Sequence, residues 1–129
     1  MKFSRYVAVV AGVFLVGFGL WAFFDPRSFF DQIATYKPYN RHLIHDIGAF
    51  QLGIGATLLI ALAWTDALAT ALAGAGAGAL MHAIAHWWDK DLGGKSSDPY
   101  TLTIIAIVIL VAGAMRHHSA RETPGAGPS

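Results

Sequence analysis

The sequence contains no cysteine, which excludes disulfides, thiolate metal sites, CxxC redox centres and cysteine nucleophiles. Charged side chains are also scarce, at 13% of residues, whereas a soluble domain carries about 25%. The net charge of +1 argues against a nucleic-acid partner. Because 55% of the 129 residues are hydrophobic, these shortages predict one integral membrane domain whose main partner is the lipid bilayer.

Four apolar runs are long enough to cross a bilayer. A spanning helix needs about 17–25 residues, because the hydrocarbon core is about 30 Å thick. We predict an all-α, integral membrane four-helix bundle over residues 1–116, followed by a disordered polar tail over 117–129. The predicted spans are residues 6–24, 47–64, 67–88 and 100–115.

Polar residues mark the boundaries of the first two spans. Asp25 ends the first span and opens a short helix. On that helix Phe29, Phe30 and Ile33 share an apolar face, which is typical of a helix lying in the membrane interface. Asn40 is suited to cap the helix that leads into the second span.

The last two spans carry similar signals. Thr65 and Asp66 are predicted to cap the third span, so that the second and third spans form a tight hairpin. Asp98 is predicted as the N-cap of the fourth span, with Pro99 in its first turn. The sequence before the first span is basic, with Lys2 and Arg5, so we expect both termini in the cytoplasm of a multi-pass cell-membrane protein.

The third span is rich in small residues. Gly74 and Gly78 form a GxxxG pattern, and Ala75 and Ala79 repeat it alongside. Small residues allow close helix contacts in membranes, where the lipid gives no hydrophobic drive for association. The pattern favours packing within the bundle, with homodimerisation as the alternative.

Histidines and acids gather at the start of the second span and the end of the third. The helical spacing of each group places its members on one face. Because the two spans are antiparallel, the two groups are expected to converge at the membrane face opposite the termini, which is the outer face in the predicted orientation. The candidates for a metal site there are His82, His86, His45 and Asp46, with His42 and Asp89 as secondary candidates.

Such a group of side chains has several possible roles. Two histidines one helical turn apart can bind a divalent transition metal, and a third His or a carboxylate completes an open site. Two histidines facing each other across a bundle can hold a haem iron. A structural hydrogen-bond network between Asp46 and the pair His82 and His86 is the main alternative, and the polar lining of a small-molecule pocket is a third.

The segment YNRHLIHDIGAFQLGIGA, followed by an apolar hairpin with an HxxxH ending, resembles small four-span membrane proteins of actinobacteria. These are similar in layout to the DoxX-like superfamily. The resemblance implies a four-helix bundle in a bacterial cell membrane, and by analogy an accessory role in a membrane redox complex.

Two functions therefore remain open from the sequence. One is a membrane protein with a metal or haem site at its outer face. The other is a non-enzymatic accessory or assembly subunit, present as a homo-oligomer or in a larger membrane complex. A small multidrug exporter is disfavoured because residues 6–24 hold no carboxylate for coupling.

Overall fold

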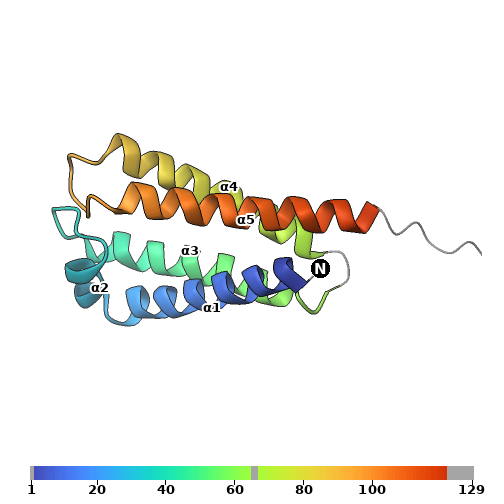
Figure 1. Ribbon diagram of the computed structural model, residues 1–129. Helices are drawn as coiled ribbons and strands as arrows, with labels where there is room; N and C mark the ends of the chain where they lie inside the picture. Colours follow the sequence, from blue (N-terminus) through green and yellow to red (C-terminus); the bar gives the residue numbers. More distant parts are fainter. Residues whose placement is uncertain (1, 65–66, 122–129) are drawn as a thin grey trace, which may run out of the picture.

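The computed structural model describes residues 2–64 and 67–121, and these form five helices in an up-and-down bundle (Figure 1). Four of the helices are long, and a short one, α2, lies at the end of the bundle away from the N-terminus. The all-α, four-helix architecture with a short helix between the first two spans is confirmed. The helices are α1 Lys2–Phe24, α2 Pro26–Gln32, α3 Arg41–Ile60, α4 Ala67–Trp88 and α5 Asp98–Arg121.

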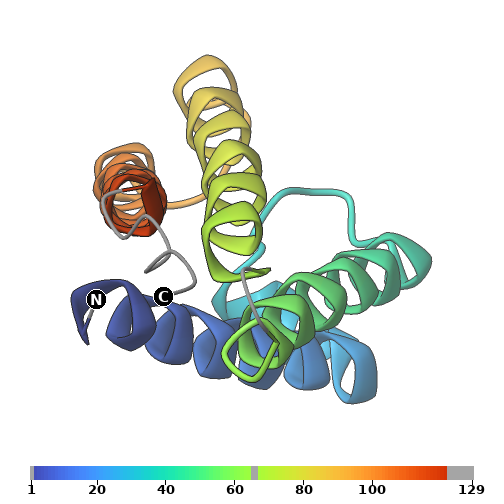
Figure 2. The same ribbon diagram turned by 90° about the vertical axis from the view of Figure 1, so that its right-hand side faces the viewer.

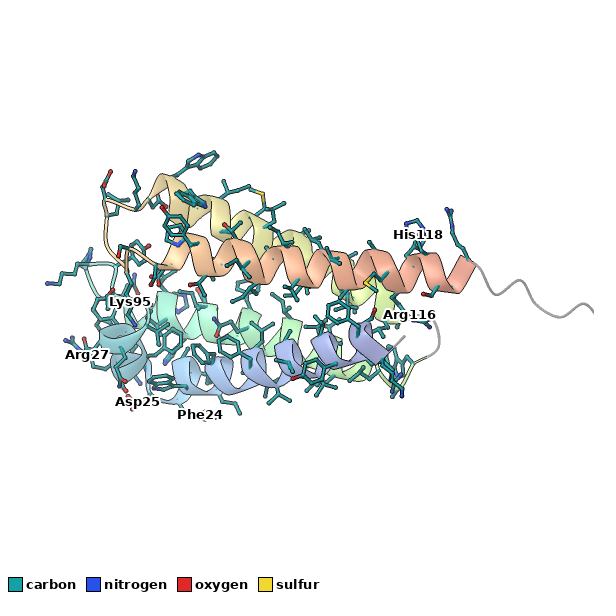
Figure 3. The ribbon with its side chains drawn as sticks, in the orientation of Figure 1. Phe24, Asp25, Arg27, Lys95, Arg116 and His118 are labelled. Carbon is teal, nitrogen blue, oxygen red and sulfur yellow. The ribbon has the colours of Figure 1, made fainter. Side chains whose placement is uncertain are left out.

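Each of the four long helices is long and apolar enough to cross a membrane. Their lengths of 20 to 24 residues correspond to about 30–36 Å at 1.5 Å per residue, which matches a hydrocarbon core of about 30 Å. Large apolar side chains such as Val13, Phe50 and Ile104 point outward and are exposed. Charged side chains lie at the two ends, as Arg27 and Arg116 do in Figure 3. The chain is a membrane protein.

Glycines set the distance between α1 and α3. A Cβ atom at Gly48 would lie 2.8 Å from the carbonyl oxygen of Gly19, and one at Gly19 would lie 2.8 Å from that of Gly48. A second contact of this kind lies seven residues away on each helix. There a Cβ atom at Gly55 would lie 2.9 Å from the carbonyl oxygen of Gly12. The two backbones therefore touch at two places where only glycine fits.

The close contact between α4 and α5 is made at glycines other than the predicted Gly74 and Gly78. A Cβ atom at Gly76 would lie 2.6 Å from Leu110 Cδ2, and one at Gly113 would lie 3.3 Å from Leu72 Cβ. Gly74 and Gly78 have no atom within 4 Å of such a Cβ. The prediction of packing inside the bundle is therefore wrong for Gly74 and Gly78, because the α5-facing side of α4 is offset from theirs by two residues. It is confirmed for Ala75 and Ala79, which pack against the buried core.

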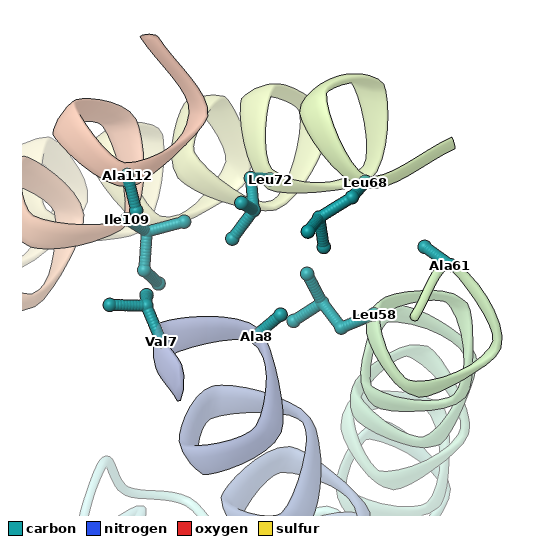
Figure 4. Close-up of a cluster of buried hydrophobic side chains, with 8 residues drawn as sticks. All are labelled: Val7, Ala8, Leu58, Ala61, Leu68, Leu72, Ile109 and Ala112. Carbon is teal, nitrogen blue, oxygen red and sulfur yellow. The ribbon is translucent and has the colours of Figure 1, made fainter. Parts of the chain in front are cut away.

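The two helix pairs meet in a core at the end of the bundle where α1 begins and α5 ends (Figure 4). Leu58 and Leu72 are fully buried at its centre. The hydroxyl of Ser4, which is 1% exposed, donates a hydrogen bond to the carbonyl oxygen of Ala112 over 2.8 Å. The core is formed by Val7, Ala8, Leu58, Ala61, Leu68, Leu72, Ile109 and Ala112.

At the other end, α2 covers α1 and α3. Phe29 and Phe30 are buried in a cluster with Ala22 and Ile44, so the aromatic face expected to meet the interface lies against the bundle. The predicted cap at Asn40 is confirmed, because its Oδ1 accepts from the Leu43 amide. Asp25 starts the short helix as expected, and its Oδ1 accepts from the Ser28 amide. The caps fix where α2 and α3 begin.

Several helix boundaries differ from those of the predicted spans. The second span ends earlier, since α3 stops at Ile60, and the predicted capping residues Thr65 and Asp66 lie outside the described residues. Asp98 is the first helical residue of α5, and its carboxylate accepts from the Lys95 amide over 2.8 Å instead of capping the helix from outside. The helix then continues to Arg121, past the start of the predicted tail.

Candidate functional site

A tyrosine from the α2–α3 connection contacts a histidine at the end of α4. The Oη atom of Tyr36 lies 3.1 Å from Nδ1 of His86, and the two rings meet edge to face with centroids 5.6 Å apart. His86 is in the last turn of α4. The contact therefore joins the α1–α3 pair to the α4–α5 pair at the end of the bundle opposite the core of Figure 4.

Two glycines in the α4–α5 connection hold Tyr36 in place. Tyr36 and Gly93 form an isolated antiparallel bridge, and both Gly93 and Gly94 have positive φ, at 152° and 77°. A Cβ atom at Gly94 would lie 2.7 Å from Tyr36 Oη. Only glycine therefore permits both this backbone path and the close approach of the phenol.

The surroundings of Tyr36 keep its hydroxyl protonated. Burial raises the pKa of Tyr36 above the ordinary value of 10.0, and the carboxylates of Asp98 and Asp89 raise this pKa further. A protonated phenol can donate to His86 Nδ1 when this nitrogen carries no hydrogen, and it can accept from Nδ1 in the other tautomer. In either tautomer, Nε2 is the remaining polar atom of the His86 ring.

His82 lies one turn deeper along α4 than His86. Their rings meet edge to face with centroids 4.7 Å apart. His82 is exposed, and among the described residues the side chain forms no hydrogen bond. A pocket of about 200 Å³ opens here, lined by Tyr36, His82, Ala85, His86 and Asp89.

The polar residues at the start of α3 form a separate group. Nε2 of His42 lies 3.5 Å from Oδ2 of Asp46, one turn along the same helix, and the His42 side chain is 87% exposed. The ring of His45 packs on Phe23 of α1, with centroids 5.2 Å apart. Figure 2 shows the cause: α3 and α4 are close at the end nearest the viewer and diverge toward the far end, where these residues lie.

This separation bears on the predicted metal centre. No group of three His, Asp or Glu side chains within the described ranges is placed to hold a metal ion. His82, His86 and Asp89 line one pocket, but Nδ1 of His86 already contacts Tyr36. Asp46 pairs with His42 on the diverging helix. The described residues therefore give no support to the predicted metal centre, and the predicted convergence of all six side chains is not supported.

The divergence of α3 and α4 leaves a groove of about 790 Å³ between them. Its walls are apolar and built largely from small residues, including Ala49 and Gly53 on α3 and Ala71 and Gly74 on α4. The hydroxyl of Thr57 also lines the groove, and it donates to the carbonyl oxygen of Gly53 on its own helix. The surface of the groove is therefore mainly apolar.

Sequence reasoning identified the His82 and His86 pair but missed Tyr36. Their pairing follows from local helical spacing, whereas the Tyr36 contact joins residues 50 positions apart. The one available signal was the consecutive glycines Gly93 and Gly94, since such pairs mark loops in which another group approaches the backbone closely.

Comparisons with known proteins found no match to this chain among protein-family models, curated proteins or solved structures.

Proposed function

We propose that this chain is a non-enzymatic accessory subunit of the cell membrane, in which Tyr36 and His86 form a structural hydrogen-bond network. The observation that carries the proposal is the 3.1 Å contact between Tyr36 Oη and His86 Nδ1. It links a connection of one helix pair to a helix of the other, at the end where α3 and α4 diverge.

Several polar groups at this end of the bundle make structural contacts. The Asp98 carboxylate accepts from the Lys95 amide and so fixes the α4–α5 connection behind Tyr36. Asp46 and His42 pair with each other. These contacts engage Asp98, Asp46 and His42, three of the groups that general acid–base chemistry could use, which supports a structural role for this end of the bundle.

The accessory role has a second basis in the shape of the bundle. The groove between α3 and α4 leaves a concave apolar surface open along the membrane-spanning part of the protein. The similarity in layout to DoxX-like proteins favours the same role by analogy. We place both termini in the cytoplasm, because Lys2 and Arg5 lie at the start of the first span.

A double-mutant cycle tests the network. Tyr36→Phe, His86→Leu and the double variant are compared with the wild type by thermal unfolding in detergent. We expect a coupling free energy of about 1 kcal/mol, since each single change removes the same hydrogen bond. His42→Leu is the matched control, because its imidazole is exposed and has no contact with Tyr36.

Metal analysis and an absorption spectrum of the purified protein complete the test. We expect no stoichiometric metal and no Soret band. A metal that is lost in His86→Leu would contradict the proposal, as would strictly additive effects of Tyr36→Phe and His86→Leu on stability.

A further inference from the structure

One face of α4 lies between the apolar groove and the polar pocket. Gly74 lines the groove and His82 lines the pocket. Gly78 lies between them at four-residue spacing, so all three residues share one helix face. A Cβ atom at Gly78 would meet nothing within 4 Å. The surface of α4 is therefore open at Gly78, between the groove and the imidazole of His82, and we call this face of the helix the path.

We propose that this path binds one uncharged long-chain amphiphile, whose hydrocarbon tail fills the groove and whose hydroxyl group bonds to His82. The volume of about 790 Å³ lies within the range of about 300–1,000 Å³ found for ligand sites. From Ala67 to His82 the path covers about 22 Å at 1.5 Å per residue, which requires a long chain.

The polar end of the path selects the head group. A neutral imidazole offers one donor and one acceptor, and a hydroxyl group offers the same complement. His82 makes no hydrogen bond within the described part of the chain, and an unpartnered polar group at depth in the membrane is costly. A ligand hydroxyl at this position gives the His82 imidazole a hydrogen-bond partner.

Charged head groups fit less well. Asp89 lines the same pocket and repels a carboxylate or a phosphate. Because His82 lies about 6 Å deeper than His86 along the helix, an ammonium group at this level would be placed inside the apolar layer, where charge is costly. The site therefore favours a long-chain alcohol or a glyceride with a free hydroxyl.

Photo-labelling in phosphatidylcholine vesicles tests the site. The probe is octadecanol with a diazirine on its chain, and labelled peptides are identified by mass spectrometry. We expect labelling on α3 and α4 that is displaced by unlabelled octadecanol, and not by stearate, octadecylamine or the shorter octanol. Labelling that excess octadecanol does not displace, or that all four compounds displace equally, overturns the proposal.

Matched variants locate the tail and the head group. Gly74→Leu and Gly78→Leu fill the path, and Gly17→Leu on α1 is the control, because each of these glycines has open space at its Cβ position. We expect the first two to reduce displaceable labelling about tenfold, which corresponds to 1.4 kcal/mol, and the control to leave it unchanged. Equal labelling of Gly78→Leu and the wild type contradicts the tail position.

His82→Phe keeps an aromatic ring without hydrogen-bonding atoms, and His82→Gln restores a donor and an acceptor. We expect a loss of octadecanol displacement in the first and partial recovery in the second. If instead Gly74→Leu lowers the mass of the detergent-solubilised particle, a second copy of the chain occupies the groove and the proposal fails. The result is independent of the Tyr36–His86 coupling, so the two proposals can fail separately.

Discussion

Gly19 and Gly48 lie against each other where α1 crosses α3, each with its Cα facing the carbonyl oxygen of the other helix. A Cβ atom added to either one would lie 2.8 Å from that oxygen, closer than such atoms approach in proteins. The contact is between two backbones, so neither side can adjust by rotating a side chain. The spacing of the first helix pair therefore depends on these two glycines.

Gly48→Ala should destabilise the protein by about 1–3 kcal/mol, because the added methyl group forces the two helices apart. Gly53→Ala is the matched control on the same helix, since a Cβ atom there meets nothing within 4 Å. In an open helical position alanine is favoured over glycine, so the control should unfold at an equal or higher temperature. Thermal unfolding in detergent measures both, and equal midpoints would refute the backbone contact.

Gly76→Leu should disrupt the α4–α5 pair, whereas Gly78→Leu should not. A Cβ atom at Gly76 would lie 2.6 Å from Leu110 Cδ2, but one at Gly78 would enter open space. We expect a large loss of thermal stability for Gly76→Leu alone. The same loss for Gly78→Leu would mean that the open face of α4 is covered when the protein is folded in detergent.

Ser4→Ala should lower the stability by about 1 kcal/mol, because it removes the hydrogen bond from a buried hydroxyl to the Ala112 carbonyl oxygen. Ser96→Ala, in the exposed α4–α5 connection, is the control. Urea or thermal unfolding distinguishes the two. An unchanged midpoint in Ser4→Ala would show that this bond does not stabilise the contact between the two helix pairs.

Stability should fall at high pH in a way that depends on Tyr36. Its pKa in the folded protein is raised by burial and by Asp98 and Asp89, above the ordinary 10.0. The stabilisation that comes from keeping the Tyr36 hydroxyl protonated is complete below pH 10.0. It is lost as the pH rises through the pKa of the folded state, because burial and the two carboxylates disfavour the phenolate there. Tyr36→Phe should remove this component from the pH profile of the unfolding midpoint, and identical profiles would contradict it.

Single cysteines can report the topology cleanly, because the protein has none of its own. Lys95 and His118 lie at opposite ends of the bundle (Figure 3). Lys95→Cys should react with an impermeant maleimide from outside intact cells, whereas His118→Cys should react only after the membrane is opened. Labelling of both from one side would exclude the four-span arrangement.

The parts of the fold that could be predicted are those decided by local physics. Asp25 and Asn40 cap their helices because each side chain reaches an amide three residues ahead. The four spans follow from apolar length, and the pairing of His82 with His86 follows from the helical repeat. None of these depends on how the helices cross.

The parts that could not be predicted depend on crossing geometry. The α1 glycines draw α3 toward α1 and away from α4 at the far end, so that Asp46 lies on a helix that diverges from His86. Helical spacing identified which residues share a face but not how far apart the two faces lie. Tyr36 belongs to a contact between connections distant in sequence, which no period in the sequence encodes.

The close partner of each long helix is its neighbour in the chain: α1 packs on α3, and α4 packs on α5. This order matters during synthesis, when the helices enter the membrane one after another. The helices α1 and α3 can pack through their glycines before α4 has been synthesised. Each span therefore finds its packing partner in the next long helix of the chain, without a long period unpaired in lipid. Assembly then ends with the docking of two finished halves, through the core around Leu58 and Leu72 and the phenol of Tyr36.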